Sequence, residues 1–261
     1  MTYRLISFTT DYGTRDGFVA ACHGTMLWSA PHVSILDVTH EIPPGDVRGG
    51  ALVLAQTVPY LPESIHVAVV DPGVGTNRRA IAIEAPRGVL IGPDNGLLPW
   101  AADALGGVDR AVELTESRWH REPVSRTFHG RDVFGPVAAA VATGTALTSL
   151  GGPIDPGDLV RLPDPLLSIT ANGLTAEVIA IDRFGNVQTA APGSAATGLA
   201  QRLLVNGTAA KSGETFGSVE TGKLVVLVDS ADRVTIARNG GSAAESLDVR
   251  IGDMVRLTAA D

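Results

Sequence analysis

The apolar pattern of this chain of 261 residues changes near residue 161, and that change limits the folds open to it. Before this point, short apolar runs alternate with segments of helix length, which is typical of a layered α/β domain. After it, a Pro-rich stretch leads into short apolar runs separated by Gly, Asn and Asp, which is typical of a small sheet or barrel. We therefore expect an α/β domain over residues 1–164 and a β domain over residues 165–261.

Strands are expected in the first domain over residues 4–10, 33–39, 64–71, 80–85 and 88–94, and helices over residues 18–30, 47–58 and 133–142. In the second domain the strand candidates lie within residues 174–189, 201–207, 223–230, 233–241 and 248–259. Asp11, Asp71 and Asp94 follow apolar strands, where the ligand crevices of open α/β sheets tend to lie.

The charge and composition exclude several classes of protein. A formal net charge of −8, with no basic cluster beyond Arg78 and Arg79, argues against nucleic acid as a partner. No apolar window is long enough for a membrane helix, and the first residues do not resemble a signal peptide. The single cysteine, Cys22, rules out an internal disulfide, so we expect a reducing, cytoplasmic setting.

The stretch FTTDYGTRDGF places Asp11 and Asp16 around a glycine, between a strand and a helix. One carboxylate there can accept hydrogen bonds from the vicinal hydroxyls of a ribose, and a second can hold an ammonium group. The alternative is that Asp11 ends a strand and Asp16 caps the helix.

In VVDPGVGTNRR, Pro72 and two glycines turn the chain sharply while Asp71 stays at the strand end. Such a turn can bring the Arg78 guanidinium back beside the Asp71 carboxylate and fix both groups in one orientation. The alternative is a buried ion pair that only stabilises the turn, which explains the same residues.

His129 in TFHGRDVFGP has the most unusual setting of the histidines, between an aromatic residue and a glycine. A neutral imidazole can orient or deprotonate a water near pH 7, although a structural role is the alternative. In IDRFGNVQT, the Asn186 amide matches the edge of an adenine and Phe184 can stack on its face. A glycine-rich turn ends SADRVTIARNGG and can read the same purine, but both segments also suit hairpin turns.

Taken in order, these segments resemble one family. TTDYGTRDGFVAACHG, HEIPPGDVRGGA, VVDPGVGTNRRAI, GPDNGLL, TFHGRDVFGPVAA and IDRFGNVQT are similar to the motifs of the S-adenosylmethionine hydroxide adenosyltransferases, which are related to adenosyl-halide synthases. The resemblance extends from Ser7 to about Ser242. It implies an N-terminal α/β/α domain and a C-terminal β-barrel. It also implies a homotrimer whose active sites lie between the N-terminal domain of one subunit and the C-terminal domain of the next.

The implied reaction is attack of water or hydroxide on the 5′-carbon of S-adenosylmethionine, giving adenosine and methionine, with no metal or cofactor. By resemblance, Asp71, Arg78 and His129 form the group that positions and activates the water. Asp11 matches the residue that holds the ribose hydroxyls, and Asp16 the one that holds the ammonium group.

The resemblance carries six positions over to the C-terminal domain. The adenine contacts match Asn186, Arg238 and the backbone near Gly240, and the pocket lining matches Asp182, Phe184 and Ser230. Two positions depart from the family pattern: Ala190 stands where many relatives have asparagine, and Ala231 where the halogenating relatives carry arginine. The methionine carboxylate is therefore expected to be bound by Ser230 and backbone donors.

Three other functions fit parts of the sequence. In an adenosyl-halide synthase, tyrosines would stand at the positions of Asp71 and His129. A nucleoside-binding protein would retain adenosine or S-adenosylmethionine without turnover. A metal-dependent hydrolase using Asp11, Asp16 and His129 is disfavoured, because no common metal-ligand spacing occurs.

Overall fold

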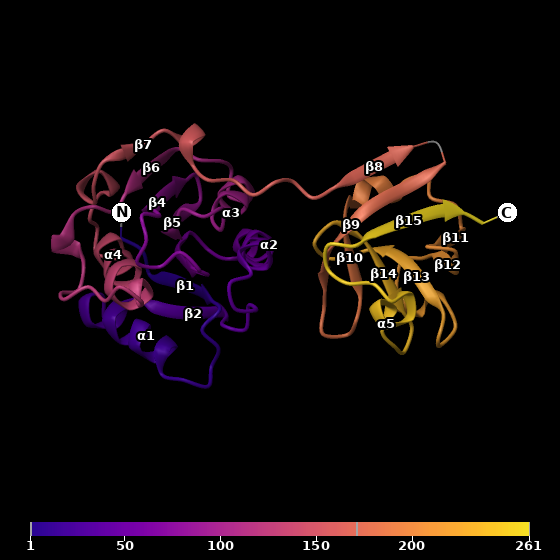
Figure 1. Cartoon of the computed structure of the whole chain (residues 1–261), viewed down its shortest axis with the longest axis horizontal. Coiled ribbons are helices and arrows are strands. Elements are labelled where there is room, and N and C mark those ends of the chain that lie inside the picture. Colours follow the sequence, from indigo (N-terminus) through magenta and orange to yellow (C-terminus); the bar gives the residue numbers. More distant parts are fainter. Residues whose placement is uncertain (1, 171, 261) are drawn as a thin grey trace. The chain divides into compact units, whose positions relative to one another are not determined.

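The computed structural model describes residues 2–170 and 172–260, which form two compact units, Met1–Leu162 and Pro163–Asp261 (Figure 1). The boundary expected between residues 164 and 165 falls just beyond this division. The first unit is an α/β layered domain and the second is a β-barrel, so the predicted fold class is confirmed.

Among the described residues of the N-terminal unit, seven strands form one sheet in the order β2-β1-β3-β5-β4-β6-β7. The strands β2, β1, β3 and β5 run parallel, so their carboxyl ends meet at one edge. Beyond β5, each neighbouring pair is antiparallel: β5 with β4, β4 with β6, and β6 with β7. The bounds are β1 Leu5–Thr10, β2 Ser34–Thr39, β3 Ser64–Val69, β4 Ala80–Ala85, β5 Gly88–Pro93, β6 Arg110–Glu113 and β7 Pro153–Ile154.

Helices cover both faces of this sheet (Figure 1). Along β3, Ile65 and Val67 join the core beneath α1 and α4, whereas Ala68 joins the core beneath α2 and α3. This alternation explains why β3 is apolar throughout, since neither of its faces meets water. The helices are α1 Phe18–Ser29, α2 Val47–Thr57, α3 Pro99–Ala104 and α4 Gly135–Ala142, with short 3-10 helices at Val58–Tyr60, Ser117–Trp119, Leu147–Ser149 and Pro156–Asp158 and a π-helix, η3, at Gly130–Phe134.

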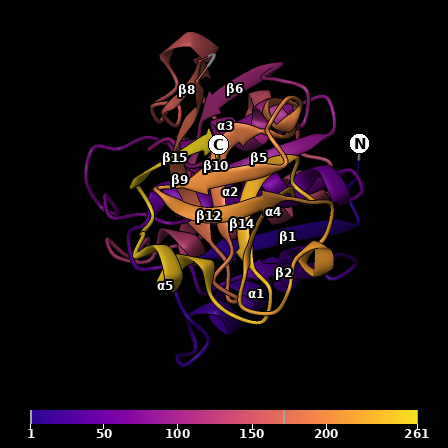
Figure 2. The ribbon, with the colours of Figure 1, turned by 90° about the vertical axis from the view of Figure 1, so that its right-hand side faces the viewer.

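In the C-terminal unit, seven of the strands that the structure describes close into a barrel in the order β10-β14-β13-β12-β11-β15-β9. The long strand β9 closes it, because its first half pairs with β15 and its second half with β10. Strand β8 pairs with β9 outside the ring. Figure 2 shows these strands curving around the unit. The bounds are β8 Leu167–Thr170, β9 Gly173–Ile181, β10 Val187–Pro192, β11 Arg202–Val205, β12 Thr208–Ser212, β13 Leu224–Val228, β14 Arg233–Arg238 and β15 Met254–Ala259, with α5 at Ala243–Leu247 and 3-10 helices at Gly193–Ala196 and Phe216–Ser218.

The structure corrects two sequence expectations. The helix expected over residues 133–142 begins earlier, at Gly130, with the π-helix. The strand expected over residues 248–259 is shorter, because Asp248 takes a left-handed conformation that ends α5 and only Met254–Ala259 is extended. Among residues 2–170 and 172–260, no helix has the length and apolar character needed to cross a membrane.

His66 on β3 makes the stability of the N-terminal unit depend on pH. Its side chain is fully buried, Ser7 Oγ lies 2.8 Å from Nδ1, and Nε2 has no hydrogen-bond partner. Burial lowers the pKa of His66 to about 4. Since an unfolded histidine binds a proton below about pH 6.5, acid favours the unfolded state, and stability is lost as the pH falls from there toward 4.

We therefore expect the free energy of unfolding to fall by about 2 kcal/mol through His66 alone between pH 7.5 and about pH 5. Urea unfolding at both pH values measures this loss. His66→Asn should lack that part of the pH dependence, whereas His32→Gln, at an exposed histidine, should keep it. An equal pH dependence in the wild type and His66→Asn would contradict the prediction.

Candidate active site

Three carboxylates follow the parallel strands where their carboxyl ends meet. Asp11 comes directly after β1, Asp71 closely after β3 and Asp94 directly after β5. Asp94 has a structural role, because it accepts hydrogen bonds from Arg79 Nε at 2.8 Å and from the Val160 amide at 3.0 Å. The two carboxylates that remain at this edge for ligand chemistry are Asp11 and Asp71.

The guanidinium of Arg78 joins Asp71 to His129. Arg78 Nε donates to both oxygens of Asp71 at 3.0 Å, and NH2 lies 2.8 Å from His129 Nδ1. The pair is well shielded, since the side chain of Asp71 is 5% exposed and that of Arg78 is 11% exposed. Thus the three side chains for which the sequence predicts one role form a single hydrogen-bonded group.

The turn between β3 and β4 requires glycine to make this group possible. Gly75 has a φ of +75°, and a Cβ there would lie 2.2 Å from the carbonyl oxygen of Arg126. A side chain would therefore force the turn away from the segment that leads to His129. With glycine, the loop that carries Arg78 packs directly against that segment.

The contact with Arg78 determines the protonation of the imidazole. A guanidinium only donates hydrogen bonds, so Nδ1 of His129 must accept, and the hydrogen of the neutral ring lies on Nε2. Burial lowers the pKa of His129, and the positive charge of Arg78 lowers it further, against the opposing effect of Asp71. His129 is therefore a neutral hydrogen-bond donor at neutral pH.

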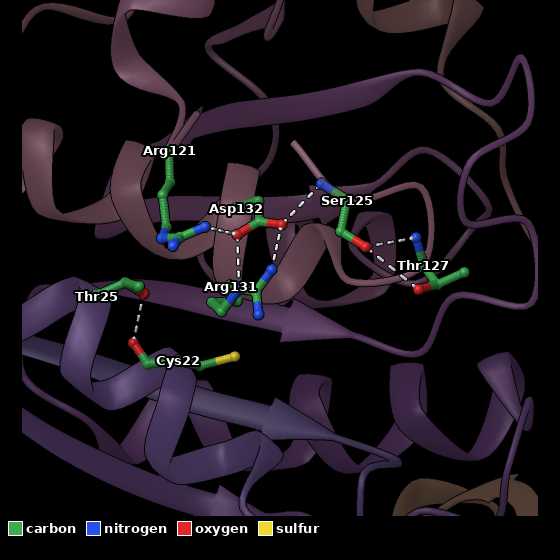
Figure 3. A network of polar contacts seen from close by, with 7 residues as sticks. All are labelled: Cys22, Thr25, Arg121, Ser125, Thr127, Arg131 and Asp132. Atoms are coloured by element: carbon green, nitrogen blue, oxygen red, sulfur yellow. Dashed lines mark hydrogen bonds and ion pairs between the residues drawn. The ribbon is translucent and has the colours of Figure 1, made fainter. Parts of the chain in front are cut away.

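A buried aspartate, Asp132, holds the segment that carries His129, and Figure 3 shows its hydrogen-bond partners. Asp132 is fully buried and accepts hydrogen bonds from Arg131 Nε at 2.7 Å and from the Ser125 amide at 2.9 Å. Burial raises the pKa of Asp132, but the hydrogen bonds from Arg131 and Ser125, together with the positive charges of Arg131 and Arg121, outweigh it and the pKa is lowered. The carboxylate stays ionised and ties the π-helix to the loop before it. Sequence reasoning did not identify this role.

Two aromatic residues of the site were also missed. The guanidinium carbon of Arg78 lies 5.2 Å from the centre of the Phe134 ring. Tyr12 follows Asp11, and a Cβ on Gly130 would lie 2.3 Å from its hydroxyl, so Gly130 leaves room for the phenol. Burial raises the pKa of Tyr12, and the nearby carboxylates of Asp11 and Asp71 raise it further. The signal in the sequence was an aromatic residue next to a predicted ligand, in DYG.

The remaining predicted residues of the N-terminal unit lie in the loop after β1. Asp11 accepts a hydrogen bond from the Gly45 amide at 2.8 Å through one oxygen. Asp16 is exposed, and the N-cap of α1 is Gly17 with no side-chain cap. The alternative that Asp16 caps this helix is therefore wrong.

In the C-terminal unit, IDRFGN forms the turn between β9 and β10. Asp182 organises it, accepting from the amides of Phe184 and Asn186 at 2.9 Å and from the Asn186 side chain at 2.7 Å. The Phe184 side chain is 69% exposed. The segment is therefore a hairpin turn, as the alternative held, and it also presents an aromatic face beside a fixed amide.

The second predicted adenine segment lies beside this turn. The amide of Ala243 donates to the carbonyl of Gly185 at 3.0 Å, which places the residues after Gly240 against IDRFGN. Arg238 ends β14 and donates to the Gly222 carbonyl. Ser230 lies in the turn between β13 and β14, at the other end of β14 from Arg238.

Comparison with known proteins agrees with this architecture. The family model described as the SAM hydroxide adenosyltransferase N-terminal domain matches residues 6–151, and the model of the C-terminal domain of that family matches residues 176–256. A protein of Salinispora arenicola named (R)-S-adenosyl-L-methionine hydrolase is 58% identical over 97% of each chain. A fluorinase of an Actinoplanes species is more distant, at 28% identity over 98% of each chain.

A solved structure has the same fold. The crystal structure of an uncharacterized conserved protein from Thermotoga maritima matches with a TM-score of 0.89 and 32% identity, over 97% of this chain and 99% of that one. Both family models and the curated relative from Salinispora arenicola agree on the family. The chain belongs to the SAM hydroxide adenosyltransferase family.

Proposed function

We propose that this protein hydrolyses S-adenosyl-L-methionine to adenosine and L-methionine. The observation that carries the proposal is the single guanidinium of Arg78 that holds Asp71 and His129 in one group. Family membership and the name of the Salinispora relative support the same substrate. That name specifies the (R) configuration, and we extend it to the sulfonium centre of the substrate here.

The chemistry sets what the site has to supply. The leaving group departs from a sulfonium as a neutral thioether, so it needs no proton. The nucleophile is the difficulty, because water is weak and hydroxide is heavily solvated. In the reaction the oxygen bonds to the 5′-carbon, the carbon–sulfur pair of electrons moves to sulfur, and the water gives up one proton.

The side chains divide this task between them. His129 donates from Nε2 to the oxygen of the nucleophile, since Nδ1 is already held by Arg78. Asp71 Oδ2 accepts two hydrogen bonds from Arg78 and Oδ1 only one, so Oδ1 keeps a lone pair that accepts from the water, orients it and receives its proton. Arg78 keeps the two groups in place and balances the negative charge that gathers beside them.

This arrangement is expected to accelerate the reaction in three ways. General acid–base catalysis of this kind typically raises the rate 10²–10⁴-fold, which lowers the barrier by about 3–5 kcal/mol. Holding the nucleophile in line with the sulfur can add up to about 7–11 kcal/mol. Hydroxide and sulfonium also neutralise each other as they react, so a pocket from which water is excluded favours the transition state.

The rest of the substrate is assigned to the other predicted residues. Asp11 receives the ribose hydroxyls and Asp16 the ammonium group. Adenine is held by Asn186, Arg238 and the backbone near Gly240, with Asp182, Phe184 and Ser230 lining the pocket. We propose that the reaction needs no metal or cofactor, because charge is cancelled within the Asp71–Arg78–His129 group and by the substrate itself.

We also propose a cytoplasmic homotrimer in which each active site combines the N-terminal unit of one subunit with the C-terminal unit of its neighbour. Two facts support this assignment. The nucleophile group lies wholly in the first unit and the predicted adenine contacts wholly in the second. Cys22 is buried as a free thiol, which suits a reducing compartment.

The direct test is to incubate the protein with each sulfur epimer in ¹⁸O-labelled water. We expect adenosine carrying the label at its 5′-oxygen, with the (R) epimer preferred. Arg78→Lys should lower kcat by about 10²–10³-fold, because a point charge cannot hold both partners at once. The matched variant Arg79→Lys changes the neighbouring arginine, which pairs with Asp94, and should keep nearly full kcat.

Two outcomes would overturn the proposal. One is 5′-halo-adenosine as the main product in chloride or fluoride buffer, which would indicate an adenosyl-halide synthase. The other is tight retention of unchanged substrate at stoichiometric enzyme, which would indicate a binding protein. Equal kcat values for the two lysine variants would refute the role of Arg78 even if hydrolysis occurs.

Subunit mixing tests the shared site. Asp71→Asn and Asn186→Ala, each inactive alone, should regain activity when they are unfolded together and refolded as mixed trimers. With random assembly, about a quarter of the sites would combine two intact halves. Activity near that fraction supports sites between subunits, while no recovery in confirmed mixed trimers would place each site within one subunit.

A further inference from the structure

A second cluster of chemically capable side chains lies outside the group that surrounds Arg78. His23 on α1, Asp37 on β2 and His40 just after β2 bring one ligand atom each to within 4.8 Å of one another. His23 Nε2 lies 2.8 Å from Asp37 Oδ1, and His40 Nε2 lies 3.0 Å from the same oxygen. No other group of three His, Cys, Asp or Glu side chains converges in this way among residues 2–170 and 172–260.

His40 has an unsatisfied nitrogen that is aimed into this cluster. The residue is 4% exposed, and its Nε2 makes no hydrogen bond of acceptable geometry, although Asp37 is close. Two imidazole nitrogens also compete for one carboxylate oxygen. A buried polar atom without a hydrogen-bond partner destabilises the folded state. A group that both nitrogens and the carboxylate can bind together would remove this penalty.

A hydrogen bond on its second ring nitrogen orients His40, as such a bond orients most metal-binding histidines. Its other nitrogen, Nδ1, lies 2.8 Å from Thr10 Oγ1, which fixes the ring and can leave the lone pair on Nε2. The Phe8 ring packs edge-on against the His40 ring at 5.0 Å and lies 5.8 Å from the His23 ring. Asp37 is 43% exposed, so an ion has a path from solvent.

From this geometry we propose that His23, Asp37 and His40 form a binding site for a borderline divalent cation of the zinc class. Two imidazoles and one carboxylate suit such an ion, with water as the fourth ligand. Ligands at 2.0–2.1 Å around a tetrahedral ion lie about 3.3 Å apart, so the two nitrogen–oxygen spacings of 2.8 and 3.0 Å need to open by a few tenths of an ångström. The two imidazole nitrogens lie within 4.8 Å of each other and can adjust to the same ion by rotation of the partly exposed His23 side chain.

The site adjoins the loop to which we assign substrate binding. Thr10 directly precedes Asp11, and the His40 carbonyl accepts a hydrogen bond from the Gly13 amide at 2.7 Å. A bound cation would therefore stiffen the start of this loop from outside the reacting centre. The proposal stands apart from the hydrolysis, since no step of that reaction uses the ion.

The experiment is calorimetric titration of ZnCl₂ into the chelator-stripped full chain. One ion per chain is expected, and Co²⁺ in its place should give the visible absorption of a four-coordinate site. His23→Gln and Asp37→Asn change the more exposed ligands, and each should weaken binding by at least about 10–100-fold, the loss found when even an outer-shell partner of a metal site is removed. His32→Gln, an exposed histidine outside the cluster, is the matched control and should bind as the wild type does.

Saturation of the wild type should also raise the midpoint of thermal unfolding, and this shift should be smaller in His23→Gln at the same ZnCl₂ concentration. No binding to the wild type would overturn the proposal. Binding of equal strength in His23→Gln and Asp37→Asn would overturn it too, because the ion would then sit elsewhere. Neither result bears on whether S-adenosylmethionine is hydrolysed.

Discussion

The contacts of one guanidinium fix the geometry of the candidate active site. Arg78 donates to a nearly buried carboxylate and to an imidazole, so neither partner can rotate without losing a charge-assisted hydrogen bond. Because the guanidinium cannot accept, it also decides which nitrogen of His129 carries the hydrogen. Three side chains of ordinary kinds thereby become a fixed acceptor, a fixed cation and a fixed donor.

Much of the N-terminal unit supports that contact. Parallel strands bring Asp11 and Asp71 to one edge of the sheet, and the glycine turn after β3 returns Arg78 to it. Next to His129, the buried carboxylate of Asp132 ties the π-helix that follows this histidine to the preceding loop. The site is thus positioned by backbone geometry and by a second, structural ion pair.

Local patterns predicted the layered domain, a small sheet or barrel after it, and the contact of Asp71 with Arg78, and the family resemblance decided for the barrel. Residues with roles set by long-range packing were missed. The Tyr12 hydroxyl occupies the space that Gly130 leaves free, and Asp132 binds the Ser125 amide of a loop that only the fold brings close to it. The short strands β6, β7, β8 and β12 were missed as well, since strands of two to five residues carry little periodicity. The cluster of His23, Asp37 and His40 was also missed, because its ligands come from a helix and a neighbouring strand that only the fold brings together.

The most direct measurement of the central claim is the tautomer of His129 by ¹⁵N NMR of histidine-labelled protein, assigned with His129→Gln. At neutral pH and without substrate, Nδ1 should be unprotonated and Nε2 protonated, and Arg78→Lys should restore a mixture of tautomers. A ring protonated at Nδ1, or one that Arg78→Lys leaves unchanged, would show that the guanidinium does not hold the imidazole and would contradict the account.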